Sequence, residues 1–403
     1  MAGYIFSIAK DSWKKVVEEN IQYGHFSPYC PVINEINDKN EKTSDKQKRA
    51  TNKILVATFG DMITMKNGDN VYFLSDRKIY GVGVTKMIGD DCKYDNYINA
   101  SAIIPDYEVS EASANYLTEK SSRARWVFFF KPAEHFFKTG VDMDDVLQFR
   151  PNAFKMLRAF ENLSFIKIDD DENRALREYI SLKNESAYEK IEERSFRFDD
   201  SKHRQMSGMN LSPYKMNIFK AMEQLDFSST IYSEMFVECA LLQLLSEKQN
   251  TLLGNWDYIT HQIIASPFKP LKYIDKIDIF GYRFSEHYNN TPKLITKYLL
   301  VELKKEKINK AALRQTMQYV DWICKEYASG DYSLIEAYVI GKETVKKIAN
   351  DKKDICQRLH ILSSHPTKQK RWDKLHIITY NMSGNKIEFS ELTEESQNSK
   401  KSI

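Results

Sequence analysis

Apolar and polar positions alternate along the first half of the chain in short runs that are typical of strands. Residues 52–59, 70–88 and 125–132 follow this pattern with turn residues between them, which predicts consecutive antiparallel strands, and residues 3–13 begin with an earlier strand. Pro132 ends the last run, because proline donates no hydrogen bond to a neighbouring strand. The first half of the chain is therefore predicted to be rich in β-structure.

The second half of the chain combines the helical period with apolar strand runs. Met235, Cys239, Leu242 and Leu245 lie along one stripe of residues 233–248, which predicts an amphipathic helix. Two strands, a helix, a strand and a hairpin are predicted to follow, at residues 271–284, 297–305, 309–328, 334–341 and 374–389. This order of helix, two strands, helix and strand predicts a mixed α/β domain.

A highly charged stretch separates the two patterns and marks the expected domain boundary. We expect an N-terminal domain over residues 1–185, a charged linker over 186–207 and a C-terminal domain over 208–392. The polar residues 393–403 are expected to form a disordered tail, and the almost wholly polar residues 34–52 an exposed loop. A chain of 403 residues is long enough for two such domains.

Composition and charge place few limits on function. The 59 basic residues nearly balance the 56 acidic ones, so a nucleic-acid partner would require a local concentration of positive charge. The five cysteines form no CxxC pair, which favours free thiols in a reducing compartment. We find no secretory signal and no stretch long enough to span a membrane, so we expect a cytoplasmic protein without a membrane partner.

An acid and a lysine share one face of the predicted strand at residues 297–305. Glu302 and Lys304 are two positions apart, whereas Leu303 between them points to the other face. Asp278 lies in an apolar frame on the preceding predicted strand. Carboxylates can bind Mg²⁺, which activates water for phosphodiester hydrolysis, and a lysine can stabilise the developing charge. The pattern indicates a metal-dependent phosphodiesterase; a solvated strand end is the alternative.

The sequence leaves two residue choices open at this site. Glu238 and Glu234 lie one turn apart on the same face of a predicted helix, so either can supply an upstream acid. Asp275 is a rival for Asp278, although its neighbour Lys276 and its lack of an apolar frame are more typical of a turn.

The order of these residues resembles that of a known family. A helix with a glutamate, then "DIFGY", then "VELK", then a helix in which Gln315 precedes Tyr319 by four positions, resembles the PD-(D/E)XK nuclease superfamily. The Mrr-like restriction nucleases and the mismatch-specific endonucleases are its most similar members. The resemblance covers about residues 228–345 and implies an α/β domain in which helices flank a mixed sheet.

The resemblance implies a metal site on the two central strands. Asp278 and Glu302 would be ligands of Mg²⁺, for which Mn²⁺ would substitute, and the carbonyl group of Leu303 would be a third ligand. Lys304 would act on the nucleophile or on the scissile phosphate.

The resemblance also implies roles for two helix residues. Glu238 fits the family pattern better than Glu234 and would be the helix acid, which binds the metal indirectly or holds water. Gln315 would orient metal-bound water or backbone. Without the resemblance, Gln315 would be interpreted as an ordinary solvent-facing helix residue.

The stretch "NGDNVYFLSDRKIYGVGVTKMIG" resembles the opening of PUA-like β-barrels, which include the EVE and YTH-type readers of modified bases. The resemblance covers about residues 3–170 and implies an α+β domain built on a PUA-like β-barrel. Such readers flip a base into an aromatic pocket. Trp126 and Tyr80 are the candidate pocket residues, and Arg125 is the candidate phosphate contact. An aromatic strand is, however, more often core than cage.

These observations predict a Mg²⁺-dependent DNA endonuclease of the restriction or anti-phage defence type. The N-terminal domain would recognise a modified or specific base, and the C-terminal domain would hydrolyse phosphodiester bonds. Double-strand cleavage requires two active sites, so a homodimer is compatible with this function. The alternatives are a repair nuclease acting on mismatched or branched DNA and a non-catalytic nucleic-acid-binding protein.

Overall fold

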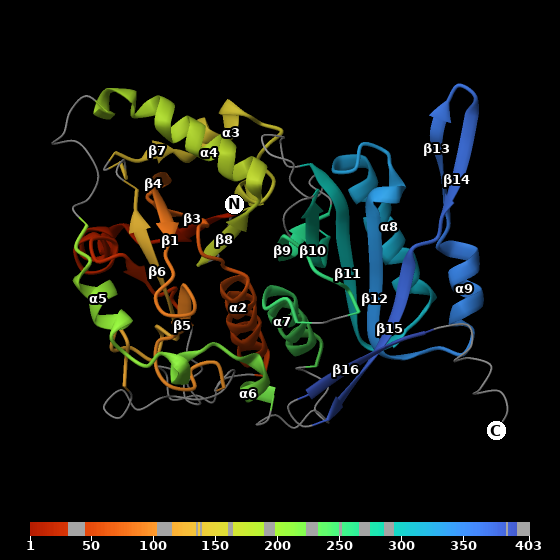
Figure 1. Cartoon of the computed structure of the whole chain (residues 1–403), viewed down its shortest axis with the longest axis horizontal. Helices are drawn as coiled ribbons and strands as arrows, with labels where there is room; N and C mark the ends of the chain where they lie inside the picture. Colours follow the sequence, from red (N-terminus) through yellow and green to blue (C-terminus); the bar gives the residue numbers. More distant parts are fainter. Residues whose placement is uncertain are drawn as a thin grey trace. The chain divides into compact units, whose positions relative to one another are not determined.

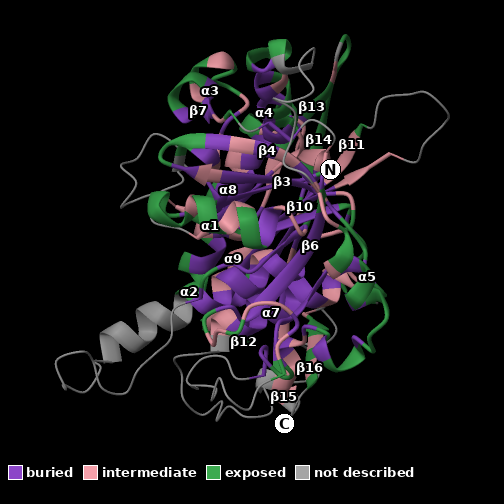
Figure 2. Cartoon of the chain, turned by 90° about the vertical axis from the view of Figure 1, so that its left-hand side faces the viewer, coloured by how far each residue is buried: buried purple, intermediate pink, exposed green. Residues whose placement is uncertain are grey.

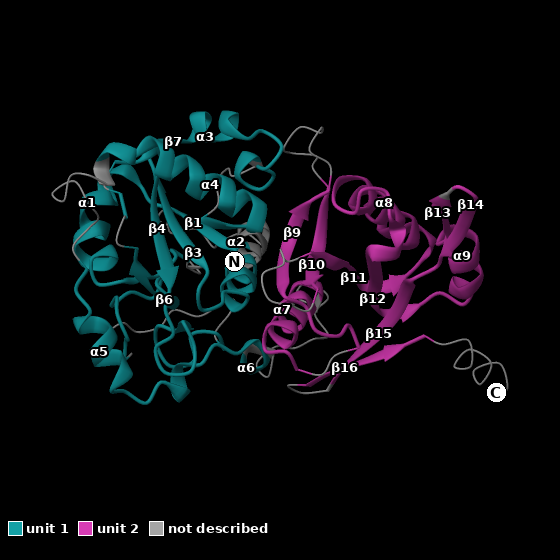
Figure 3. Ribbon diagram, turned by 45° about the horizontal axis from the view of Figure 1, so that its top comes forward, with its two compact units in different colours: residues 1–221 teal, residues 222–403 magenta. Residues whose placement is uncertain are grey.

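The computed structural model describes residues 1–30, 45–102, 115–133, 136–137, 139–159, 164–188, 198–222, 233–249, 252–265, 275–285, 294–383 and 386–392. They belong to two compact units, Met1–Ala221 and Met222–Ile403 (Figure 3). Both units combine helices with mixed sheets, which agrees with the predicted presence of helices and sheets in each domain.

The first unit is built on a curled, mixed sheet (Figure 1). Its strands lie in the order β2-β6-β4-β3-β1-β8, with β5 paired to β6 and β7 paired to β4. β1 runs parallel to β3 and antiparallel to β8. The strand bounds are β1 Gly3–Ser7, β2 His25–Phe26, β3 Asn70–Ser75, β4 Lys78–Thr85, β5 Lys93–Asp95, β6 Trp126–Pro132, β7 Val141–Asp142 and β8 Phe165–Ile168. The predicted strands at the start of the chain, at 70–88 and at 125–132 are confirmed.

The prediction of a strand at residues 52–59 was wrong, because these residues belong to helix α2, Asp45–Ile63. Its buried positions include Leu55, Phe59 and Met62, at spacings of four and three residues. That spacing places them on one face of a helix, and a strand would spread them over two faces. The helix also includes residues 45–52 of the predicted loop 34–52, and residues 34–44 lie outside the described residues.

The aromatic strands of the first unit form its core. The ring of Phe6 on β1 stacks on Phe128 of β6 at 4.7 Å and on Phe165 of β8 at 4.8 Å. Phe73 of β3 contacts Phe26 of β2 edge to face at 5.3 Å. β3 and β6 are buried along most of their length (Figure 2). Aromatic pairs of this kind add to the free energy gained by burying their surface.

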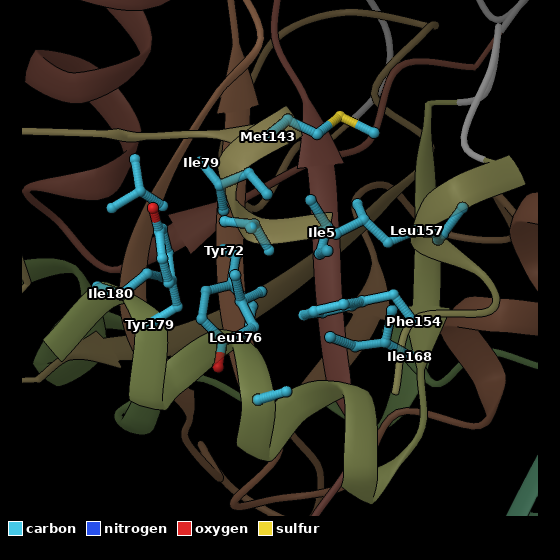
Figure 4. Packing of buried hydrophobic residues seen from close by; sticks show 14 of the residues in the cluster. Ile5, Tyr72, Ile79, Met143, Phe154, Leu157, Ile168, Leu176, Tyr179 and Ile180 are labelled. Atoms are coloured by element: carbon cyan, nitrogen blue, oxygen red, sulfur yellow. The ribbon is translucent and has the colours of Figure 1, made fainter. Parts of the chain in front are cut away.

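A second apolar cluster joins the sheet of the first unit to helix α4, Asp170–Lys183. Ile5, Tyr72 and Ile168 from three strands meet Leu176 and Ile180 of the helix (Figure 4). The other helices of this unit are α1 Trp13–Val16, α3 Met143–Phe149, α5 Ser201–Ser207 and α6 Ile218–Met222, of which α6 reaches the first residue of the second unit.

The two compact units divide between Ala221 and Met222, beyond the predicted linker 186–207. Met206 of α5 and the following Leu211 and Tyr214 pack in one cluster with residues of β5 and β6, so residues 198–207 are part of the first unit. Residues 189–197 and the predicted tail 393–403 lie outside the described residues.

The second unit is a mixed sheet in the order β16-β15-β12-β11-β10-β9. β11, β12 and β15 run parallel, whereas β9, β10 and β16 pair antiparallel with their neighbours. The strands are β9 Tyr258–Ile264, β10 Lys276–Phe284, β11 Ile295–Ile308, β12 Ile335–Thr344, β15 Leu375–Ser383 and β16 Lys386–Glu391. The helices are α7 Ser233–Ser246, α8 Lys310–Glu326 and α9 Ile348–Ile355. The predicted helices at 233–248 and 309–328 are confirmed, as are the predicted strands within the described residues. Residues 271–274 of the predicted strand 271–284 lie outside the described residues, and β9 was not predicted.

A separate hairpin follows α9 in the second unit. Its strands are β13, Arg358–Ser364, and β14, Thr367–Trp372, and they pair only with each other among the described strands (Figure 1). In the part of the chain that the structure describes, no helix is both long and apolar enough to cross a membrane.

Candidate active site

Asp278 and Glu302 adjoin each other on neighbouring strands. The antiparallel register of β10 and β11 pairs Ile279 with Val301, so Asp278 and Glu302 are the next positions on the two strands. Asp278 also accepts a hydrogen bond through Oδ2 from the backbone N–H of Leu303 at 2.7 Å. The strand pairing thus positions both acids without any contribution from a loop.

Lys304 connects β11 to helix α8. Its Nζ atom lies 2.6 Å from Glu302 Oε1 and 3.1 Å from Gln315 Oε1. Gln315 in turn donates from Nε2 to the hydroxyl group of Tyr319 at 2.9 Å. The structure therefore brings Lys304 and Gln315 together, and the four-residue spacing of Gln315 and Tyr319 makes them neighbours on one helix face.

Glu238 of α7 contacts the first strand of the sheet. Its Oε1 atom lies 2.9 Å from His261 Nδ1 and 3.3 Å from Gln262 Nε2. The same Gln262 Nε2 lies 3.4 Å from Asp278 Oδ1. Gln262 thus donates to both carboxylates and connects the helix acid to the acids of the central strands.

The backbone of Gln262 has an unusual conformation for a strand residue. Its φ of 53° lies in the left-handed region, which costs a residue other than glycine about 1–3 kcal/mol. The pairing of β9 with β10 passes from Ile263 to His261 without a partner assigned to Gln262. Because the strand is locally distorted there, the neighbours His261 and Gln262 both reach Glu238.

The two glutamates of α7 have different contacts. Glu234 Oε2 accepts a hydrogen bond from the backbone N–H of Lys305 at 2.8 Å, and burial raises the pKa of this carboxyl group. Glu238 is joined through Gln262 to Asp278. These contacts favour Glu238 as the acid that adjoins the strand carboxylates and give Glu234 a hydrogen-bonding role at β11.

Burial and nearby negative charge raise the pKa values of the two strand carboxylates, Asp278 and Glu302. Burial raises the pKa of Asp278 well above its usual range, and repulsion from Glu302 and Glu238 adds to this effect. Burial likewise raises the pKa of Glu302 to about 7, although Lys304 opposes the shift. Excess negative charge of this kind is relieved by a cation or by a proton.

The donor set fits a hard divalent cation. Glu302 Oε2 is buried and accepts no hydrogen bond from a described residue, so a carboxylate oxygen remains available beside Asp278. Among the described residues, however, no three Asp, Glu, His or Cys side chains are grouped closely enough to form a ready-made metal cage. Mg²⁺ commonly uses only one or two protein carboxylates and completes its shell with water and phosphate oxygens.

Two further predicted residues lie close to these acids along the chain. Leu303 contributes its backbone N–H group to the site, in the hydrogen bond to Asp278. Asp275 precedes β10, and its carbonyl group accepts from Ala265 N at 2.8 Å.

The candidate base-reading residues lie in different surroundings. Trp126 is fully buried, and its Nε1 donates to Ser101 Oγ at 3.2 Å. Arg125 is also buried. Tyr80 is partly exposed, and its ring lies 4.2 Å from that of Trp13. Trp126 and Arg125 therefore contribute to the interior of the first unit, whereas Tyr80 and Trp13 form an aromatic pair near its surface.

Sequence reasoning missed two residues of the site, His261 and Gln262. Both belong to β9, whose central residues "THQ" are polar. A run of polar residues between apolar ones is typical of a turn, so the sequence gives little indication of a strand here.

Comparison of the chain with models of known protein families and with curated proteins finds no match to either.

Proposed function

We propose that the chain is a Mg²⁺-dependent endonuclease whose second unit hydrolyses the phosphodiester bonds of DNA. One observation carries the proposal: the Lys304 ammonium group lies between Glu302 and Gln315, on the strand next to Asp278. A helix with Glu238, the strands with Asp278 and Glu302, and the helix with Gln315 occur in the order that the PD-(D/E)XK resemblance leads us to expect.

Asp278 and Glu302 would hold the cation in this proposal. Mg²⁺, when bound, supplies positive charge at the phosphate and lowers the pKa of a coordinated water molecule. Glu238 adjoins Asp278 through Gln262, so it is placed to hold a further water molecule by hydrogen bonding. The raised pKa values of Asp278 and Glu302 support the assignment, since a cation relieves their mutual repulsion.

Lys304 offsets negative charge on the phosphate during the reaction. Gln315 accepts a hydrogen bond from its ammonium group and so restrains the side chain. The oxygen of a water molecule gives up a proton and forms a bond to phosphorus, the bond from phosphorus to O3′ breaks, and O3′ takes up a proton to leave as a 3′-hydroxyl group. A lysine that donates to a non-bridging oxygen stabilises the transition state more than the substrate, because the charge there increases.

The first unit is the proposed reader of a modified or specific base. This part of the proposal depends on the PUA-like resemblance and on a curled sheet with aromatic residues. Restriction or anti-phage defence follows if the reader controls cleavage. A repair nuclease is the alternative, and it predicts that mismatched or branched duplexes are cut faster than modified ones.

The test is a cleavage assay with purified protein, Mg²⁺ and DNAs that differ in base modification. Asp278→Ala and Lys304→Ala should each lower the cleavage rate by about 100-fold or more, which is the usual effect of removing a charged group from the reaction centre. Lys307→Ala is the matched control, because Lys307 lies on the same strand in an ion pair of 3.2 Å with Glu343. Unchanged cleavage by both site variants would refute the proposal.

A further inference from the structure

The β13–β14 hairpin of the second unit, residues 358–372, exposes both cations and apolar side chains; we refer to it as the β-ribbon. Lys368, Lys370 and Arg371 are exposed, and none of them forms an ion pair with a described residue. The sequence from Leu359 to Trp372 contains neither aspartate nor glutamate. The exposed part of the β-ribbon therefore carries charge of one sign only.

The base of the β-ribbon is fixed to the rest of the unit. Arg358 donates from Nε and Nη2 to the two carboxylate oxygens of Asp321 on α8, both at 2.8 Å. Trp372 is buried, and its Nε1 donates to the carbonyl group of Ile335 at 3.0 Å. His360 is buried as well. A two-point arginine–carboxylate contact is geometrically specific, so the hairpin is held as an arm.

The two faces of the β-ribbon differ. Arg358 pairs with Trp372 and His360 pairs with Lys370 across the hairpin, and these positions form the attached face, on which Lys370 is nevertheless exposed. Leu359 pairs with Arg371, and Ile361 pairs with Gln369, on the opposite face. Leu359 and Ile361 are 66% and 65% exposed. Large aliphatic side chains that project into solvent beside Arg371 are a feature that the fold of the unit does not require.

We infer that the β-ribbon binds duplex DNA in the major groove and holds it for cleavage by the same unit. The inference rests on the proposed function for its choice of DNA as the partner. The major groove, about 12 Å wide, admits a two-stranded ribbon. Lys368, Lys370 and Arg371 would contact phosphates, and the outward Leu359 and Ile361 would contact base edges, where a thymine methyl group offers an apolar surface.

Charge argues against a second copy of the chain as the occupant. A two-fold interface through the face of Leu359 and Ile361 would bring Arg371 close to Arg371 of a second copy, and like charges oppose pairing. Lysines on edge strands also prevent sheets from joining edge to edge. That protective role explains the cations but leaves the exposed Leu359 and Ile361 without a function.

The experiment measures binding of a fluorescent duplex to the full-length chain with Lys304→Ala, which prevents cutting, over a range of salt concentrations. Replacement of Lys368, Lys370 and Arg371 together by Gln should weaken binding about tenfold or more and lower the slope of log K against log salt by about 2.7, or about 0.9 for each phosphate contact. Leu359→Ser with Ile361→Ser should weaken binding without changing that slope.

The matched control replaces Lys248, Lys325 and Lys386 by Gln, three exposed lysines elsewhere in the unit, so the net charge changes equally. The inference fails if the β-ribbon variant and the control bind equally. It also fails if Leu359→Ser with Ile361→Ser converts a dimer to a monomer in sedimentation. Failure of the proposed function is distinguishable, because the unaltered chain would then not cut duplex DNA with Mg²⁺, whereas failure of the inference appears in the binding comparison alone.

Discussion

Lys304 and Glu302, two positions apart on β11, form an ion pair of 2.6 Å in which the Glu302 side chain is 3% exposed and that of Lys304 is 26% exposed. The pair therefore leaves a nearly buried carboxylate with a partner that solvent reaches. Desolvation of a buried charge lowers the free energy of unfolding unless its pairing compensates, so the effect of this carboxylate on stability can be tested directly.

Replacement of Glu302 by Gln is expected to stabilise the second unit in metal-free buffer while it abolishes cleavage. The substitution removes a buried charge and its repulsion by Glu234 and Glu238 but retains the shape of the side chain. We expect a gain of about 1 kcal/mol in the free energy of unfolding, because relief of burial and repulsion outweighs the lost ion pair with the partly exposed Lys304. Thermal unfolding with a chelator measures it, and a clear loss of stability would contradict the assignment of strain to this carboxylate.

Mg²⁺ is expected to raise the unfolding temperature of the unaltered chain. A cation at about 100 times its Kd stabilises the folded state by about 2.7 kcal/mol if the unfolded chain does not bind it. Asp278→Ala should remove this effect, and Lys307→Ala should preserve it. Calorimetric titration with Mg²⁺ gives an independent readout, in which a flat trace for the unaltered chain would exclude the metal site.

Gln262→Gly is expected to separate backbone strain from the positioning of side chains. Glycine adopts the positive φ of this position without cost, so the stability of the unit should not fall. Loss of the amide that joins Glu238 and Asp278 should lower kcat about tenfold with little change in KM, because substrate binding is not altered. Steady-state kinetics checks this, with Gln262→Asn as the variant that retains an amide. Unchanged kcat would show that Gln262 has no positioning role.

His25 is expected to make the first unit sensitive to acid. Burial lowers the pKa of His25 to about 3, and the nearby Lys202 and His203 contribute to the shift. The folded-state pKa thus lies below the unfolded value of 6.5, so stability is complete above about pH 6.5 and is lost as the pH falls toward 3. At about pH 5 the loss is about 2 kcal/mol.

Replacement of His25 by Phe should remove most of this dependence. Unfolding by urea at several pH values between neutral and mildly acidic measures it. His376→Gln is the control, because His376 lies on the surface in a contact of 2.7 Å with Glu391. Parallel pH profiles for the unaltered chain and His25→Phe would show that other groups cause the acid sensitivity.

The central strands of the site were predictable because their pattern is unambiguous. An apolar run with Asp278 and a second with Glu302 and Lys304 form adjacent strands, and period two puts Glu302 and Lys304 on one face. Antiparallel pairing of consecutive strands then brings Asp278 beside Glu302. Local sequence is sufficient for this part of the site.

The remaining parts depend on tertiary contacts that no local pattern encodes. His261 and Gln262 are polar because they contact Glu238 of the preceding helix α7, so β9 resembles a turn when it is considered alone. Residues 52–59 have the composition of a strand, yet their buried positions follow the period of α2. The β-ribbon was missed because its side chains are exposed, and an exposed hairpin has no burial pattern.

The position of β1 affects the order in which the first unit can be assembled. β1 lies between β3 and β8, and Ile5 pairs with Tyr72 on one side and with Ile166 on the other. During synthesis, the segment that forms β1 emerges before those of β3 and β8, and it lacks one neighbour until β8 leaves the ribosome. An aromatic strand that waits for a distant partner slows folding and exposes the nascent chain to aggregation, so this unit has reason to depend on chaperones.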